Sequence, residues 1–206
     1  MYTPDAFDET RPEALAALIR DHPLGLLISG GAAGLVANPL PFRFYPDEAV
    51  LRAHLARANP QWRALAETPD CLVVFQGAQG YVTPSWYPAK REHGKVVPTW
   101  NYMIVQARGR ATLCQDADWL RRQIDDLTRA REAARPEPWA VADAPAPFVA
   151  AQLRGIVGVE IAVETLAGKW KLSQNRSEAD RSGVAEGLAA EGAAEIARHV
   201  AAPGKD

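Results

Sequence analysis

LGLLISGGAAGLVANPLPFRFY, residues 24–45, is the stretch that decides the fold. The apolar run 24–29 predicts a strand, the glycine-rich segment 30–34 predicts a hairpin turn, and 35–45 predicts a second strand beside the first. Pro39 and Pro41 interrupt that second strand. Because proline cannot donate to a sheet ladder, this strand should be broken there or lie at an edge. The stretch therefore predicts antiparallel pairing at the margin of a sheet.

Further strands are predicted outward from this hairpin, with helices at both ends of the chain. The apolar patterns indicate strands at 49–55, 71–77, 103–114 and 156–173, the last bent at Gly168, and helices at 10–22, from 60, at 116–131, at 146–154 and from 177 to about 199. Residues 81–102 and 135–147 are predicted as loops, and 202–206 as a disordered tail. Since strands and helices do not alternate, a parallel doubly wound sheet is disfavoured. We expect an α+β, mainly antiparallel β architecture, a barrel with peripheral helices.

The composition is that of an ordinary globular protein with nearly balanced charge. The 206 residues include 23 basic and 25 acidic side chains, a net charge of -2 and a pI of about 6.1. This balance disfavours direct DNA binding, which usually needs a basic excess. No apolar run approaches the roughly 20 residues of a membrane span, and the start MYTPDAFDET is unlike a signal peptide. We expect a cytoplasmic protein with no membrane partner, in which Cys71 and Cys114 stay reduced.

The common catalytic and metal-binding motifs are missing from the sequence. It contains no P-loop, no GxGxxG and no HExxH, and its four histidines lack the spacing of metal ligands. Four other stretches carry polar side chains in patterns that fit ligand binding.

HLARANPQW, residues 54–62, joins a predicted strand to a predicted helix. Asn59 suits an N-cap and Pro60 a first helical position, so unpaired backbone N–H groups and a partial positive charge are expected there. Arg57 and His54 would add donors, and the group resembles a phosphate cradle. The alternative is that Asn59 only caps the helix and Arg57 is solvated.

The stretch ANPLPFRF carries Asn38, Pro39, Leu40 and Pro41. Its prolines and asparagine leave backbone groups free to meet a flat heterocycle. An edge strand guarded by proline against aggregation explains the same residues equally well.

WYPAKREHGKVVPTWNY, residues 86–102, mixes aromatic and basic side chains. Such mixtures occur at single-stranded nucleic-acid sites, but the charges of Lys90, Arg91, His93 and Lys95 cluster in one short segment. A solvated loop tip between packed aromatics is the better interpretation. Thr99, Trp100 and Asn101 follow it as a strand that could enter a binding site.

GKWKLSQNR, residues 168–176, ends the last predicted strand with a run of polar side chains. These are Lys171, Ser173, Gln174, Asn175 and Arg176. Such a run is costly to bury without partners, so it either contacts a ligand or forms a surface turn.

Taken together, these stretches resemble the PaiB-like FMN-binding negative transcriptional regulators. The resemblance is carried by MYTPDAFDE, HLARANPQW, YVTPSWYPAK, VPTWNY and KWKLSQNR in that order, and it covers residues 1 to about 190. It implies one FMN-binding split-barrel domain over 1–190, with 191–206 as an alanine-rich C-terminal helix and tail. It also implies a homodimer with FMN at the interface.

The resemblance suggests roles for the four stretches. The FMN phosphate would lie at His54, Arg57, Asn59 and the helix start, and ANPLPF would run along the isoalloxazine ring. VPTWNY and KLSQNR would supply contacts across the dimer. The implied function is a regulator that binds FMN. One alternative is a flavin-dependent oxidoreductase that uses NAD(P)H or another donor on a small-molecule substrate, and a third is a heme-binding or heme-degrading barrel with His93 as axial ligand.

Overall fold

The protein is described from a computed structural model, which places residues 1–31 and 34–203. The predicted turn at 30–34 and the predicted tail at 202–206 therefore fall partly outside the described residues.

The strands form one eight-stranded sheet. They are β1 (Asp8–Glu9), β2 (Leu24–Ser29), β3 (Val36–Pro41), β4 (Arg43–Tyr45), β5 (Val50–Ala56), β6 (Asp70–Val82), β7 (Thr99–Cys114) and β8 (Ile156–Lys171). The order is β3-β2-β6-β7-β8-β5-β4, with β1 paired to β8. The pairs β2–β3, β2–β6, β4–β5, β5–β8 and β1–β8 are antiparallel, as predicted.

The sheet has two edges, β3 and β4, which are consecutive in the chain. Leu24 pairs with Pro41 and Leu26 with Pro39, so the prolines lie on an edge strand. The strand breaks between them and β4 at Phe42, which is only 2% exposed and packs edge-on against Phe75 at 5.7 Å. Of the two predicted alternatives, the edge position is confirmed, because β3 runs through both prolines and ends only after Pro41.

The helices lie at both ends of the chain and between strands. They are α1 (Pro12–Asp21), α2 (Gln61–Glu67), α3 (Ala89–Glu92), α4 (Ala117–Glu132), α5 (Ala146–Arg154), α6 (Glu178–Ala190) and α7 (Ala194–Ala201), with 3-10 turns η1 (Asp5–Phe7), η2 (Pro46–Glu48), η3 (Pro84–Trp86) and η4 (Val141–Asp143). Asp116 caps α4 by accepting from Trp119 N at 2.8 Å, and Ser177 caps α6 by accepting from Asp180 N at 3.2 Å. These caps explain why helices begin where the sequence predicted them, after Asp116 and Ser177.

Three local predictions need correction. The loop predicted at 81–102 is shorter, because β6 continues to Val82 and β7 begins at Thr99, extended by aromatic and β-branched residues that favour strands. The helical region predicted from 177 to 199 is two helices, separated where Gly192 adopts a φ of +84°. The third correction concerns Asn59, which is not the N-cap of α2.

The helix α2 begins at Gln61, and its N-cap is Pro60. The Asn59 side chain instead accepts from Gln61 N at 3.0 Å, two residues on, in the manner of an Asx turn. The helix start is therefore one residue later than predicted.

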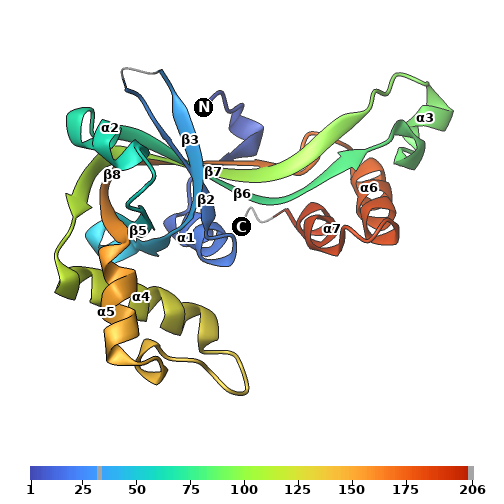
Figure 1. The fold of residues 1–206 in the computed structure, drawn as a ribbon. Helices are drawn as coiled ribbons and strands as arrows, with labels where there is room; N and C mark the ends of the chain where they lie inside the picture. The colour runs from blue at the N-terminus through green and yellow to red at the C-terminus, as the bar shows by residue number, and fades with distance from the viewer. Residues whose placement is uncertain (32–33, 204–206) are drawn as a thin grey trace. The chain divides into compact units, whose positions relative to one another are not determined.

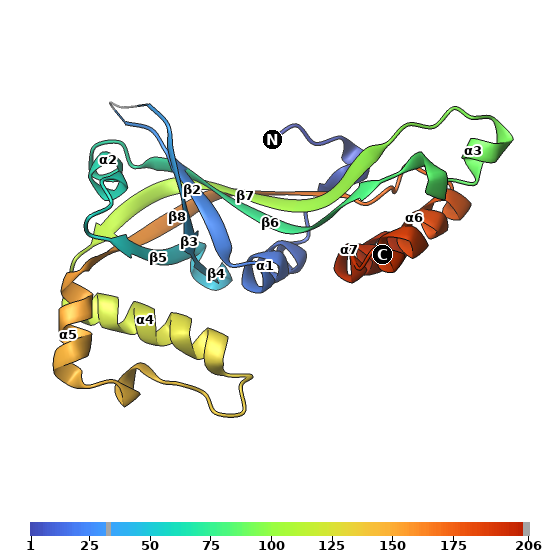
Figure 2. The ribbon, with the colours of Figure 1, turned by 45° about the vertical axis from the view of Figure 1, so that its right-hand side comes forward.

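The chain divides into two compact units. The first unit comprises Met1–Leu15, Gln76–Val105 and Ala167–Asp206, and the second comprises Ala16–Phe75 and Gln106–Leu166. In the first unit, α6 and α7 lie side by side, and α3 lies at the end of the hairpin made by β6 and β7 (Figures 1 and 2). In the second unit, α4 and α5 pack together at the end of β5 and β8 (Figure 1).

The core of the second unit fills the inner face of the curved sheet. Its residues with no measurable exposure come from five strands and α2, and they are Leu27, Leu51, Ala53, Leu65, Val73, Phe75, Ala107, Val157, Val159 and Ile161. In β5, inward side chains alternate with Arg52 and His54, which are partly exposed on the outer face. This alternation directs His54 away from the core.

Candidate functional site

Arg57, the main candidate for a phosphate ligand, makes three hydrogen bonds within the second unit. Its Nε donates to Arg154 O at 2.9 Å, Nη1 to Gln115 Oε1 at 2.7 Å and Nη2 to Ile156 O at 3.0 Å. These bonds use three of the five N–H donors of the partly exposed guanidinium, and all three acceptors are uncharged oxygens. The side chain therefore joins three segments of the second unit, and the prediction that it binds a phosphate stays a prediction.

His54 points to a different element from Arg57. Its Nδ1 lies 2.8 Å from Oε1 of Gln123 on α4. The two side chains therefore hydrogen-bond to separate parts of the second unit, and the structure does not bring them together around one anion.

Asn38 and Asn59 are linked by a residue that the sequence reasoning missed. Asn38 Nδ2 donates to Gln61 Oε1 at 2.8 Å, and Gln61 N donates to Asn59 Oδ1 at 3.0 Å. Gln61 is 1% exposed, and its Nε2 donates to Leu27 O at 3.0 Å and Ser29 Oγ at 3.1 Å. This amide fixes α2 against β2 and β3. Beside it on β3, Pro39 and Pro41 are exposed and Leu40 is buried.

The VPTWNY and KLSQNR stretches meet in the first unit. Lys171 at the end of β8 donates from Nζ to Thr99 Oγ1 and, at 2.7 Å, to Trp100 O at the start of β7. Asn101 Nδ2 donates to Ser173 Oγ at 2.9 Å, and both residues are buried. Since Ser173 has a φ of +64°, the turn after β8 is strained into this contact.

The polar side chains of the KLSQNR turn find more internal partners than its sequence suggests. Gln174 accepts from Leu172 N at 2.7 Å and donates to Trp170 O at 2.6 Å. The Arg176 guanidinium lies 5.0 Å from the centre of the Tyr87 ring, and Asn175 is exposed. Many of the polar groups that suggested a bound ligand are therefore satisfied within the protein. The groups that still favour a ligand are the charged ones.

Positive charge gathers around Lys171 without a matching acid. In the described part of the first unit, no carboxylate lies within ion-pair distance of Lys169, Lys171 or Arg176. Burial lowers the pKa of Lys171 below the ordinary lysine value, and the like charges of Lys169 and Arg176 lower it further. A bound anion would relieve both effects.

Aromatic faces border this cationic cluster. Trp100 is 47% exposed and packs edge-on against Tyr81, with ring centres 5.8 Å apart. The Lys169 ammonium lies 5.5 Å from the centre of the Tyr102 ring. An exposed indole beside ammonium groups that lack an acidic partner fits a ligand that carries both a flat ring and an anionic group, as FMN does.

The other predicted features have simpler surroundings. Lys90, Arg91 and Lys95 are exposed, as a solvated loop tip requires, and His93 Nδ1 accepts from Lys95 N at 3.0 Å.

Among residues 1–31 and 34–203 no group of histidines, cysteines or acids could hold a metal ion. Within the same residues, no helix has the length and apolarity that crossing a bilayer requires.

Comparison with known proteins relates this architecture to flavin-binding barrels. Residues 1–165 match a family model described as "Putative FMN-binding domain". The chain is 34% identical to the Bacillus subtilis protein "Protease synthase and sporulation protein PAI 2", over 91% of this chain and 89% of that protein. It is 36% identical to an uncharacterized protein of Aspergillus fumigatus, with 91% and 90% covered.

Solved structures share the fold at low sequence identity. The "FAD and Heme binding protein from Mycobacterium smegmatis" superposes with a TM-score of 0.60 at 20% identity, over 80% of this chain and 73% of that one. The "Flavocytochrome Anf3 from Azotobacter vinelandii" gives 0.59 at 14% identity, over 80% and 69%. Together with the matched family model, these similarities show that the chain has the split-barrel fold and belongs to the PaiB-like family of FMN-binding-domain proteins.

Proposed function

We propose that this protein binds FMN at the cationic and aromatic cluster of the first unit. The observation that carries the proposal is Lys171, whose ammonium is partly buried between like charges and has no carboxylate partner in the described unit. The family match and the exposed Trp100 beside it support a flavin as the ligand. The phosphate would pair with Lys171, and the isoalloxazine ring would pack on the indole.

A flavin titration of matched variants tests this placement. Lys171→Gln removes the charge but keeps a hydrogen-bond donor for Thr99 and Trp100, whereas Arg91→Gln removes an exposed charge on α3. Loss of a charge-assisted phosphate contact costs about 1.5–3 kcal/mol, so Lys171→Gln should weaken FMN binding roughly tenfold or more. Arg91→Gln should bind FMN as the unmodified protein does.

The same titration examines the earlier prediction that Arg57 holds the phosphate. Because its guanidinium hydrogen-bonds to three segments of the second unit, we expect Arg57→Ala to lower stability more than FMN affinity. A specific loss of FMN binding in Arg57→Ala, with Lys171→Gln unaffected, would move the phosphate to the start of α2. Absence of FMN binding by the unmodified chain would refute the function itself.

We further propose that the protein is a homodimer. Leu24 and Leu26 on β2 are 64% and 38% exposed, beside the edge strand β3. Apolar side chains on one strand suit a self-complementary interface, and two-fold dimers are the commonest assemblies. Light scattering should give twice the 22.4 kDa of one chain. A single-chain mass near physiological salt would contradict the dimer.

The role of the flavin is proposed to be regulatory, as the resemblance to the PaiB-type regulators suggests. The net charge of -2 gives no basic excess for direct DNA binding, so we expect regulation through another partner. Steady oxidation of NAD(P)H by the FMN-loaded protein, with a small-molecule acceptor, would favour the oxidoreductase alternative instead. A Soret band in place of flavin absorption would favour the heme alternative.

A further inference from the structure

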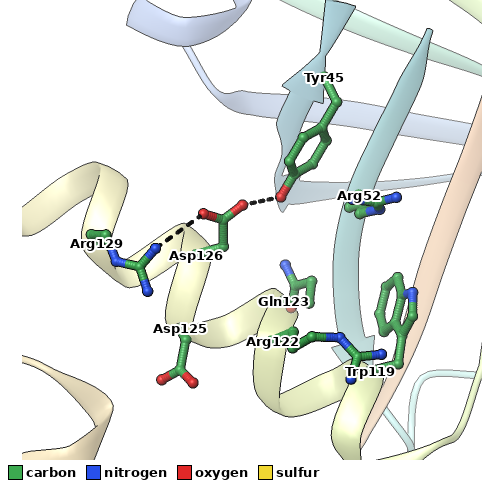
Figure 3. Close-up of a pocket in the computed structure, with 8 residues that line it drawn as sticks. All are labelled: Tyr45, Arg52, Trp119, Arg122, Gln123, Asp125, Asp126 and Arg129. Carbon is green, nitrogen blue, oxygen red and sulfur yellow. Dashed lines mark hydrogen bonds and ion pairs between the residues drawn. The ribbon is translucent and has the colours of Figure 1, made fainter. Parts of the chain in front are cut away.

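A cavity of about 400 Å³ lies between α4 and the strands β4 and β5 of the second unit. Figure 3 shows the side chains from both strands and from α4 that line it. Its volume is within the range of small-molecule sites. All of its walls belong to the second unit, whereas the cluster proposed for FMN belongs to the first.

Gln123 presents an unsatisfied buried amide to this cavity. The residue is 4% exposed, and its Oε1 is held by His54 at 2.8 Å. Its Nε2 has no hydrogen-bond partner among the described residues, and it points into the cavity between Asp126 and Arg52 (Figure 3). Because a buried donor without an acceptor is unfavourable, a ligand oxygen here would restore a missing hydrogen bond.

The acids of the cavity are already paired, but one arginine is not. Asp126 accepts from Tyr45 and pairs with Arg43 at 2.9 Å, and Asp125 pairs with Arg121 at 3.0 Å. Arg122 is exposed at the rim and makes no ion pair or hydrogen bond within the described chain. The cavity therefore has donors available and few free acceptors, which selects for an anion.

Two features limit the charge and shape of that anion. The carboxylates of Asp125 and Asp126 remain in the wall, so a single negative charge is easier to accommodate than two. Trp119 supplies a flat apolar surface, and its ring is held in place against Gly158, where an added Cβ would lie 2.2 Å from the indole. A ligand with a planar body could pack on it.

We propose that this cavity binds a small aromatic carboxylate. The carboxylate accepts from Gln123 Nε2 and pairs with Arg122, and the ring packs against Trp119. The site is separate from the flavin cluster and does not depend on flavin binding.

Benzoate is the probe for this proposal, observed by NMR of the full ¹⁵N-labelled chain. The Trp119 indole N–H, assigned with Trp119→Phe, and the Gln123 side-chain amide should shift saturably as benzoate is added. Arg122→Gln removes the unpaired charge, and Arg198→Gln is its matched control, because Arg198 is an exposed helical arginine that does not line the cavity. Gln123→Glu keeps an acceptor for His54 while replacing the free donor with an acceptor.

We expect Arg122→Gln and Gln123→Glu each to weaken benzoate binding roughly tenfold or more, since each removes a charge-assisted contact. Arg198→Gln should bind as the unmodified chain does. Absence of saturable shifts, or equal losses in Arg198→Gln and Arg122→Gln, would overturn the proposal. Inorganic phosphate binding as tightly as benzoate would overturn the assigned ligand class. If Gln123→Glu fails to fold, the exposed Arg122 still provides the decisive comparison.

Discussion

The close approach of α6 to the 3-10 turn η3 allows a sharp test of packing in the first unit. A Cβ added at Gly183 would lie 2.1 Å from the backbone oxygen of Trp86, and one added at Gly187 would lie 2.2 Å from its indole ring. Both contacts are well inside van der Waals distance. The two glycines therefore allow α6 to pack closely on Trp86. Because α6 follows the KLSQNR turn, a test of this packing also tests how the turn is held in place.

The expected magnitudes differ because the two obstacles differ. Replacing glycine by alanine inside a helix gains about 1 kcal/mol in propensity, whereas overpacking costs about 1–3 kcal/mol. The obstacle at Gly187 is a partly exposed side chain that can move, so Gly187→Ala should change stability little. The obstacle at Gly183 is backbone, which cannot move alone, so Gly183→Ala should destabilise the fold by about 1–2 kcal/mol after the propensity gain.

A second background separates the two mechanisms. With Trp86→Ala, the ring is gone and Gly187→Ala should become stabilising by about 1 kcal/mol, the full helix propensity. Gly183→Ala should remain destabilising, because the backbone oxygen of residue 86 is still present. Ser182→Ala, at an exposed position of the same helix, is the control for propensity alone. Urea unfolding followed by circular dichroism measures all of these. If Gly183→Ala were as stable as the unmodified protein, the close packing of α6 on η3 would be refuted.

Two further predictions follow from perturbed pKa values. Binding of an anion should raise the lowered pKa of Lys171, because the anion stabilises the charged ammonium. FMN affinity should therefore be full below that pKa and fall as the pH rises through it. FMN titrations from neutral pH upward should show this fall, and Lys171→Gln should not show it. Burial raises the pKa of Cys71 to about 11, and the thiol donates to Gly109 O. Alkylation should therefore label the half-buried Cys114 first and reach Cys71 only on unfolding. Peptide mass spectrometry of the labelled chain measures both rates, and equal rates for the two thiols would contradict this prediction.

Local signals in the sequence predicted local structure well. The bounds of β2 and α5 are those predicted, and Asp116 and Ser177 cap the helices predicted at 116–131 and from 177. These features depend on a few neighbouring residues. Propensity predicted the ends of β6 and β7 less well, because both strands extend into the loop predicted at 81–102.

Partners distant in the chain could not be predicted in the same way. His54 meets Gln123, 69 positions later, and Arg57 donates to carbonyls 97 and 99 positions away, because β5 pairs with β8 and α4 packs beside it. The sequence assigned VPTWNY and KLSQNR to one site, but it could not show that Lys171 contacts Thr99 within one chain. Such contacts follow from strand order, which periodicity alone does not determine.

Arg57 and Lys171 show why a binding motif needs its surroundings to be interpreted. An arginine before a helix start has the stronger phosphate signature in sequence. In the fold, three of its five N–H donors are bonded to uncharged oxygens at 2.7–3.0 Å, and these bonds join Gln115, Arg154 and Ile156 to the start of α2. Lys171 has a plainer context in sequence, but its ammonium is partly desolvated beside two other cations. Both side chains hydrogen-bond to uncharged oxygens, but only Lys171 has a pKa lowered by burial and by neighbouring cations. An anion at Lys171 would offset that existing penalty, which is our reason for proposing the phosphate site in the first unit.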